Sequence, residues 1–193
     1  AKIEKITTTN IRIKSNYTIG IPEHKKVAAH RIKQLIAHEL MAHAITRENG
    51  EKQQWHIFSY GFPRYIYSQE GLAVWHETLA TPEYKANILY RAARDAFLAQ
   101  EADRLTGKEL MNLLLTMFKP ANAWQTYIRL KRGITNTNTI GGWGRESVYF
   151  IGYNQLSQLD KVDDIFYSGR ITVDDIAVAT KYNSIAHIDR PQF

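Results

Sequence analysis

The feature that most constrains this chain is a pair of histidines five residues apart in a segment with helical spacing. The stretch HELMAH places His38 and His43 on either side of Glu39. On a regular α-helix each residue turns by ~100°, so these two side chains would lie about 140° apart and could not share one ion. Two remedies exist: the helix ends or distorts between the histidines, or a π-turn, with its wider turn and i→i+5 hydrogen bonds, returns both rings to one face. The sequence therefore predicts either a distorted metal-binding helix or two unrelated histidines.

A third metal ligand is expected some tens of residues further along the chain. Zinc in a catalytic site takes three protein ligands and a water. The best candidate is Glu70 in QEGLAVWHE, in the first turn of a helix predicted over about 69–79 that can fold back on the first. Glu39, beside the first histidine, has the position expected of a general base for the water.

Other acidic and histidine residues near these motifs allow weaker readings. Glu77 follows Glu70 by seven residues on the same helix face, and it could orient a ligand histidine or form an ion pair. His30, His56 and His76 could be ligands, but a place on the surface or behind the ligands is the favoured interpretation.

The remaining pattern predicts a mainly α-helical α+β protein with a small N-terminal β-sheet. Residues 5–21 are rich in Thr, Ile and Tyr and predict one or two strands. A long helix is expected over 23–48, with Pro22 at its start and Asn49-Gly50 as its stop. Further helices are expected over about 82–103, over 107–118 after a capping box of Thr106 and Glu109, and over 121–132 and 145–159, with a loop over 134–144. A last helix, capped by Thr172 to Asp175, is expected to run to about 182. The whole of 1–193 is interpreted as a single catalytic domain, or as the catalytic portion of a longer family pattern.

Composition narrows the class of protein. The 193 residues contain no cysteine, which excludes disulfides, cysteine ligands and a cysteine nucleophile. No window approaches ~18 consecutive apolar residues and the start lacks a signal-peptide core, so a cytoplasmic protein without a membrane partner is expected. The net charge of +6 is interpreted as a solvated surface, because no nucleic-acid-binding signature accompanies it. The oligomeric state is not indicated.

Two motifs in this order resemble one family. HELMAHAITRENG, followed by GFPRYIYSQEGLAVWHE, is similar to the microtubule-associated tyrosine carboxypeptidases and their bacterial relatives, the QEGLA-motif proteins. The lead-in GIPEHKKVAAHRIKQLIAHEL and the later YIRLKRGI and GGWGRESVYFIGY extend the resemblance over roughly residues 10 to 180. It implies a zincin-like metallopeptidase core in which His38, His43 and Glu70 bind zinc and Glu39 is the base. Eukaryotic members of the family remove a C-terminal tyrosine, notably from α-tubulin.

The function expected from motifs and resemblance together is a zinc-dependent carboxypeptidase. It would remove a C-terminal tyrosine or another aromatic residue from a protein or peptide. Tyr149 and Arg145, in the matching later helix, are candidates to stabilise the oxyanion or hold the substrate. Arg132 is the first candidate to clamp the free carboxylate and Lys131 the second. Tyr60, Phe62 and Tyr65, just ahead of Glu70, could line a pocket for a tyrosine side chain, or they could serve packing instead.

Some residues depart from the family pattern, and other functions stay open. Ala42 stands where the family often has Thr, and Arg145-Glu146 where it often has Lys-Asp. These departures concern the substrate more than the metal. One alternative is another zinc hydrolase, such as an aminopeptidase, dipeptidase or amidase. Another is a basic helical binding domain without enzymatic activity. Two histidines and one carboxylate would also suit iron.

Overall fold

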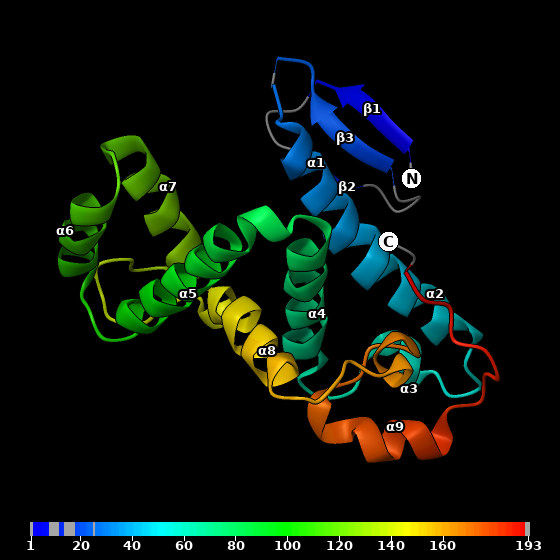
Figure 1. Cartoon of the computed structure of the whole chain (residues 1–193). Coiled ribbons are helices and arrows are strands. Elements are labelled where there is room, and N and C mark those ends of the chain that lie inside the picture. Colours follow the sequence, from blue (N-terminus) through cyan, green and yellow to red (C-terminus); the bar gives the residue numbers. More distant parts are fainter. Residues whose placement is uncertain (1, 8–11, 14–17, 25, 192–193) are drawn as a thin grey trace. The chain divides into compact units, whose positions relative to one another are not determined.

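The computed structural model describes residues 2–7, 12–13, 18–24 and 26–191 (Figure 1). The chain divides into two compact units. Unit 1 comprises Ala1–Ile88 together with Gly152–Phe193, and unit 2 comprises Leu89–Ile151. That all 193 residues form one catalytic domain stays a prediction.

Unit 1 begins with the small sheet that the sequence predicted. Strands β1 (Lys2–Ile6), β2 (Arg12–Ile13) and β3 (Thr18–Pro22) lie in the order β1-β3-β2. β3 pairs in parallel with β1 and antiparallel with β2. Pro22 ends β3 instead of starting a helix, so that part of the prediction is wrong. Its ring leaves no N–H for a ladder, which suits the end of a strand.

One continuous helical run carries the HELMAH motif (Figure 1). It consists of α1 (Ala29–Ile36), the π-helix η1 (Ala37–Ala44) and α2 (Ile45–Lys52). Of the two remedies that the histidine spacing allows, the structure has the π-turn, whereas the predicted bounds of 23–48 are wrong. Asn49 and Gly50 do not stop the helix but serve its packing: Asn49 donates to the Tyr167 carbonyl at 2.8 Å, and a Cβ on Gly50 would lie 2.6 Å from the Phe58 carbonyl oxygen.

The QEGLA motif lies on a helix that begins earlier than the sequence predicted. Helix α3 (Ile57–Tyr60) ends at Gly61, whose φ is 112°. Arg64, with a φ of 62°, then leads into α4 (Tyr65–Ala80). Glu70 consequently lies in the second turn of α4, not in the first.

The rest of unit 1 packs around α4. It includes the end of α8 (Val148–Ser157), the 3₁₀ turns η4 (Asp164–Tyr167) and η5 (Val173–Asp175), and α9 (Ile176–Tyr182). Thr172 precedes the last helix as predicted, and its hydroxyl donates to Asp175 Oδ2 at 2.8 Å. The core contains Phe58, Leu72, Leu156, Phe166 and Ile171.

Unit 2 is helical throughout its described elements. The turn η2 (Pro82–Tyr84) leads into α5 (Lys85–Ala102), most of which belongs to unit 2, and α6 (Gly107–Met117), α7 (Pro120–Leu130) and η3 (Gly144–Ser147) follow. The predicted capping box of Thr106 and Glu109 is confirmed at the start of α6. Its core includes Leu98, Leu110, Leu114, Ala123 and Leu130.

The fold class is therefore the predicted one, mainly helical with a small sheet near the N-terminus. Among the residues that the structure describes, no helix is long and apolar enough to span a membrane.

Candidate metal centre

The centre is built on two antiparallel helices that keep a constant register. Three polar contacts join the HELMAH run to α4 and to Thr81, the residue that follows α4: Gln34 to Thr81 at 2.9 Å, His38 to Glu77 at 2.8 Å and Thr46 to Gln69 at 2.9 Å. Each step of four or eight residues forward along one helix is matched by an equal step back along the other. Ala42 and Ala73 lie midway in this register and are both fully buried. Side chains this small let the two backbones approach closely at the level of the candidate metal ligands.

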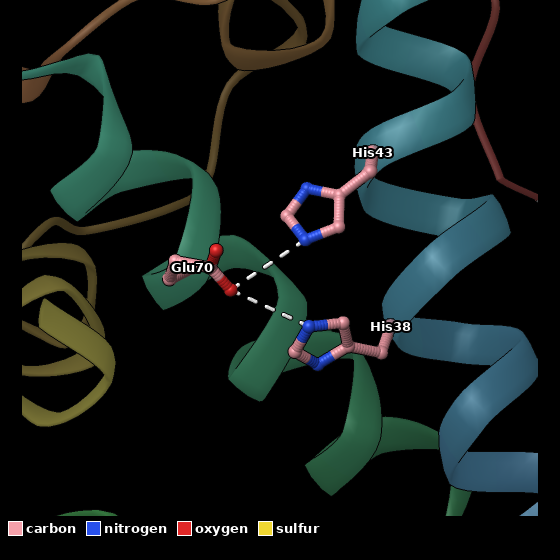
Figure 2. A group of neighbouring side chains, drawn as sticks. All are labelled: His38, His43 and Glu70. Carbon is pink, nitrogen blue, oxygen red and sulfur yellow. Dashed lines mark ion pairs between the residues drawn. The ribbon is translucent and has the colours of Figure 1, made fainter. Parts of the chain in front are cut away.

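The π-helix turns both histidines toward α4. The rings of His38 and His43 have centroids 5.0 Å apart and are inclined at 77°. Figure 2 shows Glu70 reaching from α4 toward both rings. Glu70 Oε2 lies 3.4 Å from His38 Nε2 and 3.5 Å from His43 Nε2. Three side chains that the sequence selected as ligands thus converge on one point.

Their spacing suits a tetrahedral ion. Ligand atoms at ~2.1 Å from a tetrahedral zinc ion are separated from one another by roughly 3.4 Å. The two contacts of Glu70 Oε2 have that separation, and all three ligand atoms lie within 4.8 Å of one another. Two imidazoles and one carboxylate are also a donor set of catalytic zinc sites. The residues present therefore fit the metal.

Glu77 orients the first histidine. Its Oε1 lies 2.8 Å from His38 Nδ1, on the opposite side of the ring from Glu70. When Nδ1 carries a proton donated to Glu77, the lone pair of Nε2 faces the ligand side. The structure thus favours the first of the two readings of Glu77, that it positions a ligand histidine.

The three groups perturb one another strongly. Burial lowers the pKa of His38, but hydrogen bonds and charges from Glu70 and Glu77 outweigh it and raise that pKa to about 10. Burial opposes ionisation of Glu70, but His38 and His43 hold the pKa of its carboxyl well below the usual value. Without a metal, His38 therefore carries a proton near neutral pH, and an ion must displace it.

The first three residues of the QEGLA motif each have an identifiable structural role. Gln69 contacts the Thr46 hydroxyl and Glu70 is the candidate ligand. Gly71 faces the backbone of α8: a Cβ on Gly71 would lie 2.2 Å from the carbonyl carbon of Gly152, and one on Gly152 would lie 1.8 Å from the Tyr67 carbonyl oxygen. Two glycines thus let α8 cross α4 backbone to backbone, next to the candidate ligand.

The other histidines lie outside this group. His30 stacks on Tyr84 with centroids 4.0 Å apart, and His56 is exposed. His76 is in the core, and its Nε2 lies 3.0 Å from the Tyr167 hydroxyl. Burial lowers the pKa of His76 to about 4, so it packs as a neutral ring. A surface place for His76 is therefore wrong.

The three aromatic residues suggested for a tyrosine pocket have different surroundings. Phe62 packs edge-on against Phe58 in the core, and Tyr60 is 78% exposed. Tyr65 lies under the guanidinium of Arg170, at 5.6 Å from the ring centroid. For Phe62 the structure therefore favours the alternative reading, a role in packing.

The predicted substrate-binding residues belong to unit 2. Lys131 is buried, and its ammonium group donates to the carbonyls of Thr139 and Gly141 at 2.7 Å each and of Ala102 at 3.5 Å. Its donors are thus used within unit 2, so we withdraw Lys131 as a carboxylate clamp. Arg132, by contrast, is exposed just after α7.

The two remaining candidates lie near the start of α8. Arg145 is in η3 and Tyr149 is in the first turn of α8. The roles of Arg132, Arg145 and Tyr149 stay predictions.

Sequence reasoning missed Thr46 and Gln69. Both are buried, and together they tie the HELMAH run to α4 one turn beyond His43. The signal was available, because pairing His38 with Glu77 in an antiparallel register puts Gln69 opposite Thr46.

Comparison with known proteins agrees with this arrangement. The sequence profile described as microtubule-associated tyrosine carboxypeptidase matches residues 5–193. Microtubule-associated tyrosine carboxypeptidase 1 of Mus musculus is 24% identical over 167 residues, which are 82% of this chain and 35% of that protein. The Homo sapiens protein of the same name is 26% identical over 150 residues, 74% of this chain and 31% of that protein. Putative tyrosine carboxypeptidase MATCAP2 of Homo sapiens is 26% identical over 156 residues, 76% and 29% of the two chains.

This chain therefore spans about a third of the length of the curated relatives it matches. The profile, in contrast, covers nearly all of it, including the helical run with His38 and His43 and the helix with Glu70. The chain belongs to the microtubule-associated tyrosine carboxypeptidase family.

Proposed function

We propose that this chain is a zinc-dependent carboxypeptidase that removes a C-terminal residue, tyrosine or another aromatic, from a protein or peptide. The observation that carries the proposal is the convergence of His38, His43 and Glu70 on one point within the family's motif pair. The relatives' names supply the tyrosine preference.

The three ligands leave room for a reactive fourth position. When bound, zinc would polarise the scissile carbonyl and acidify an attacking water. Structural zinc sites usually use four protein ligands, often including cysteine, and this chain has no cysteine. A donor set of two histidines and one glutamate therefore supports a hydrolytic site over a purely structural one.

Glu39 is the residue proposed to move the proton. It follows His38 directly on η1, so its carboxylate starts from the same turn that presents the ligand ring. It would accept the proton of the attacking water and return it to the leaving amine. Glu77 keeps His38 in one tautomer throughout and takes no part in bond breaking.

Substrate recognition requires a cation for the free carboxylate and a donor for the oxyanion. Arg132 remains the first candidate for the cation. Arg145 and Tyr149 are the candidates for the oxyanion or for substrate positioning. Because Lys131 is committed to carbonyls of its own unit, it has no part in this proposal.

The test compares cleavage of a peptide ending in tyrosine with cleavage of the same peptide amidated at its C-terminus. We expect release of tyrosine from the free acid alone. Glu39→Gln should keep its zinc and lose about 10² to 10⁴-fold in turnover. Glu48→Gln, an exposed acid on α2, is the matched control and should behave as wild type. Equal cleavage of the amidated peptide, or full activity in Glu39→Gln, would contradict the proposal.

A further inference from the structure

Unit 2 contains a cavity whose lining is rich in arginine. The cavity has a volume of about 460 Å³ and lies along α7. Arg94 from α5, Arg129 from α7 and Arg132 just beyond α7 all line it. No carboxylate is found among the described residues of its lining. Three cations facing one space without an acid among them indicate a site for an anion.

Two of these arginines are held in place by carboxylates that lie outside the cavity. Arg94 donates to Asp95 Oδ1 from Nε at 2.9 Å and from Nη2 at 2.7 Å. Arg129 Nη2 donates to Asp95 Oδ2 at 3.1 Å, and its Nε lies 3.3 Å from Glu146 Oε1. The side chains of Asp95 and Glu146 are only 17% and 14% exposed and do not line the cavity. The two carboxylates therefore orient the guanidinium groups without occupying the cavity. Because these arginine side chains are already ordered, they lose less conformational entropy when a ligand binds.

Neutral hydrogen-bonding groups complete the same wall. Asn122, Gln125 and Thr126 line the cavity at helical spacing with Arg129, so they share one face of α7. Their side chains make no hydrogen bond to protein within the part of the chain that the structure describes. Two amides and one hydroxyl can thus donate to an oxygen-rich ligand.

The aromatic edge of the cavity adds rigidity. The guanidinium of Arg94 lies 5.0 Å from the centroid of Phe118, which also lines the cavity. Stacking of this kind and the two bonds to Asp95 hold Arg94 in one orientation. A planar fork held in place is suited to bidentate contact with an oxyanion.

We infer that this cavity binds an oxyanion group, a phosphate or a carboxylate, held by the three arginines and by the polar face of α7. The inference goes beyond the proposed peptidase activity, because it needs neither the metal nor cleavage. Only Arg132 appears in both proposals, so the test must also use a residue that belongs to this cavity alone.

The test is a calorimetric titration of the full chain with inorganic phosphate at low ionic strength. Saturable binding is expected in the wild type and in His43→Ala, whose metal centre lacks a ligand. Gln125→Glu puts a negative charge on the cavity wall, and Arg132→Ala removes one cation. Each should weaken phosphate binding at least about tenfold. Arg104→Ala, which removes a 64% exposed arginine outside the cavity, should leave binding unchanged.

Three results would overturn the inference. The first is the absence of saturable phosphate binding by the wild type. The second is loss of binding in His43→Ala, which would place the bound anion at the candidate metal centre. The third is equal weakening of binding in Arg104→Ala, which would indicate general attraction of charge. Because binding is measured without cleavage, these results leave the peptidase proposal untouched.

A competition experiment distinguishes a phosphate ligand from a carboxylate ligand. A glutamate-containing peptide, acetylated at its N-terminus and amidated at its C-terminus, carries side-chain carboxylates alone. Displacement of phosphate by this peptide would identify a carboxylate ligand. Phosphate binding without displacement would identify a phosphate group.

Discussion

Removing the charge of Glu77 beside His38 should change the zinc affinity through two opposing effects. Glu77→Gln keeps an oxygen that can accept from His38 Nδ1, but it removes a negative charge 2.8 Å from the ring. Loss of such a carboxylate partner typically lowers metal affinity by about 10 to 100-fold, or roughly 1.4 to 2.7 kcal/mol. The same loss makes His38 easier to deprotonate, because Glu77 helps to raise its pKa.

The pH dependence separates these effects. In the wild type the pKa of His38 is about 10, so protons compete with the metal at every pH below that value. At pH 7 this competition weakens apparent zinc binding, and the affinity should rise with pH until His38 loses its proton. In Glu77→Gln the rise should end at a lower pH and reach a lower plateau. The two affinity curves should therefore converge as the pH falls.

The assay is zinc titration against a competing chelator between pH 6.5 and 9.5, with proton release measured by calorimetry in two buffers. The wild type should release about one proton per zinc at pH 7, and Glu77→Gln should release less. Glu83→Gln, an exposed acid six residues further along, is the control. Identical affinity curves for Glu77→Gln and wild type across this range would refute the reasoning.

Three other perturbations test the fold around the site. Gly152→Ala should destabilise the protein by about 1–3 kcal/mol in urea unfolding, because the new Cβ would lie 1.8 Å from a backbone carbonyl oxygen. Gly144→Ala meets no atom within 4 Å and is its control, so equal loss in both would contradict the close-packing argument. Buried His76 has a pKa lowered to about 4, so below pH ~6.5 the unfolded chain takes up a proton that the folded protein resists. Stability should fall by up to about 3 kcal/mol between pH 6.5 and 4, and a His76→Phe variant that shows the same slope would rule out this source. Lys131→Met leaves two carbonyls at 2.7 Å without their donor and should destabilise the protein by about 1–3 kcal/mol; unchanged unfolding relative to Lys108→Met, at an exposed lysine, would refute that role.

Local patterns predicted which side chains come together at the candidate metal centre, because the constraints on His38, His43 and Glu70 are largely local. The five-residue spacing of His38 and His43 required a wider helical turn, and the π-helix over Ala37–Ala44 provides it. Glu77 was found by helical periodicity from Glu70. The capping box at Thr106 was predicted for the same reason, since reciprocal hydrogen bonds between two residues only three positions apart define it.

Features that depend on distant contacts escaped prediction. Asn49-Gly50 has the composition of a helix stop, but contacts with Phe58 and Tyr167 make it an interior packing site. Lys131 looked like a free cation, yet three carbonyls brought together by the loop after α7 surround it. In each case the residue's partners lie outside its own helical turn, at least eight residues away, and local propensity carries no information about them.

The central claim is that His38, His43 and Glu70 hold a catalytic zinc ion. The most direct measurement is elemental analysis of protein purified without added metal, in parallel with His43→Ala and with His56→Ala, an exposed histidine outside the centre. We expect one zinc per chain in the wild type and in His56→Ala, and loss of zinc in His43→Ala. Absence of metal from the wild type even after zinc is added, or stoichiometric zinc retained by His43→Ala, would contradict it.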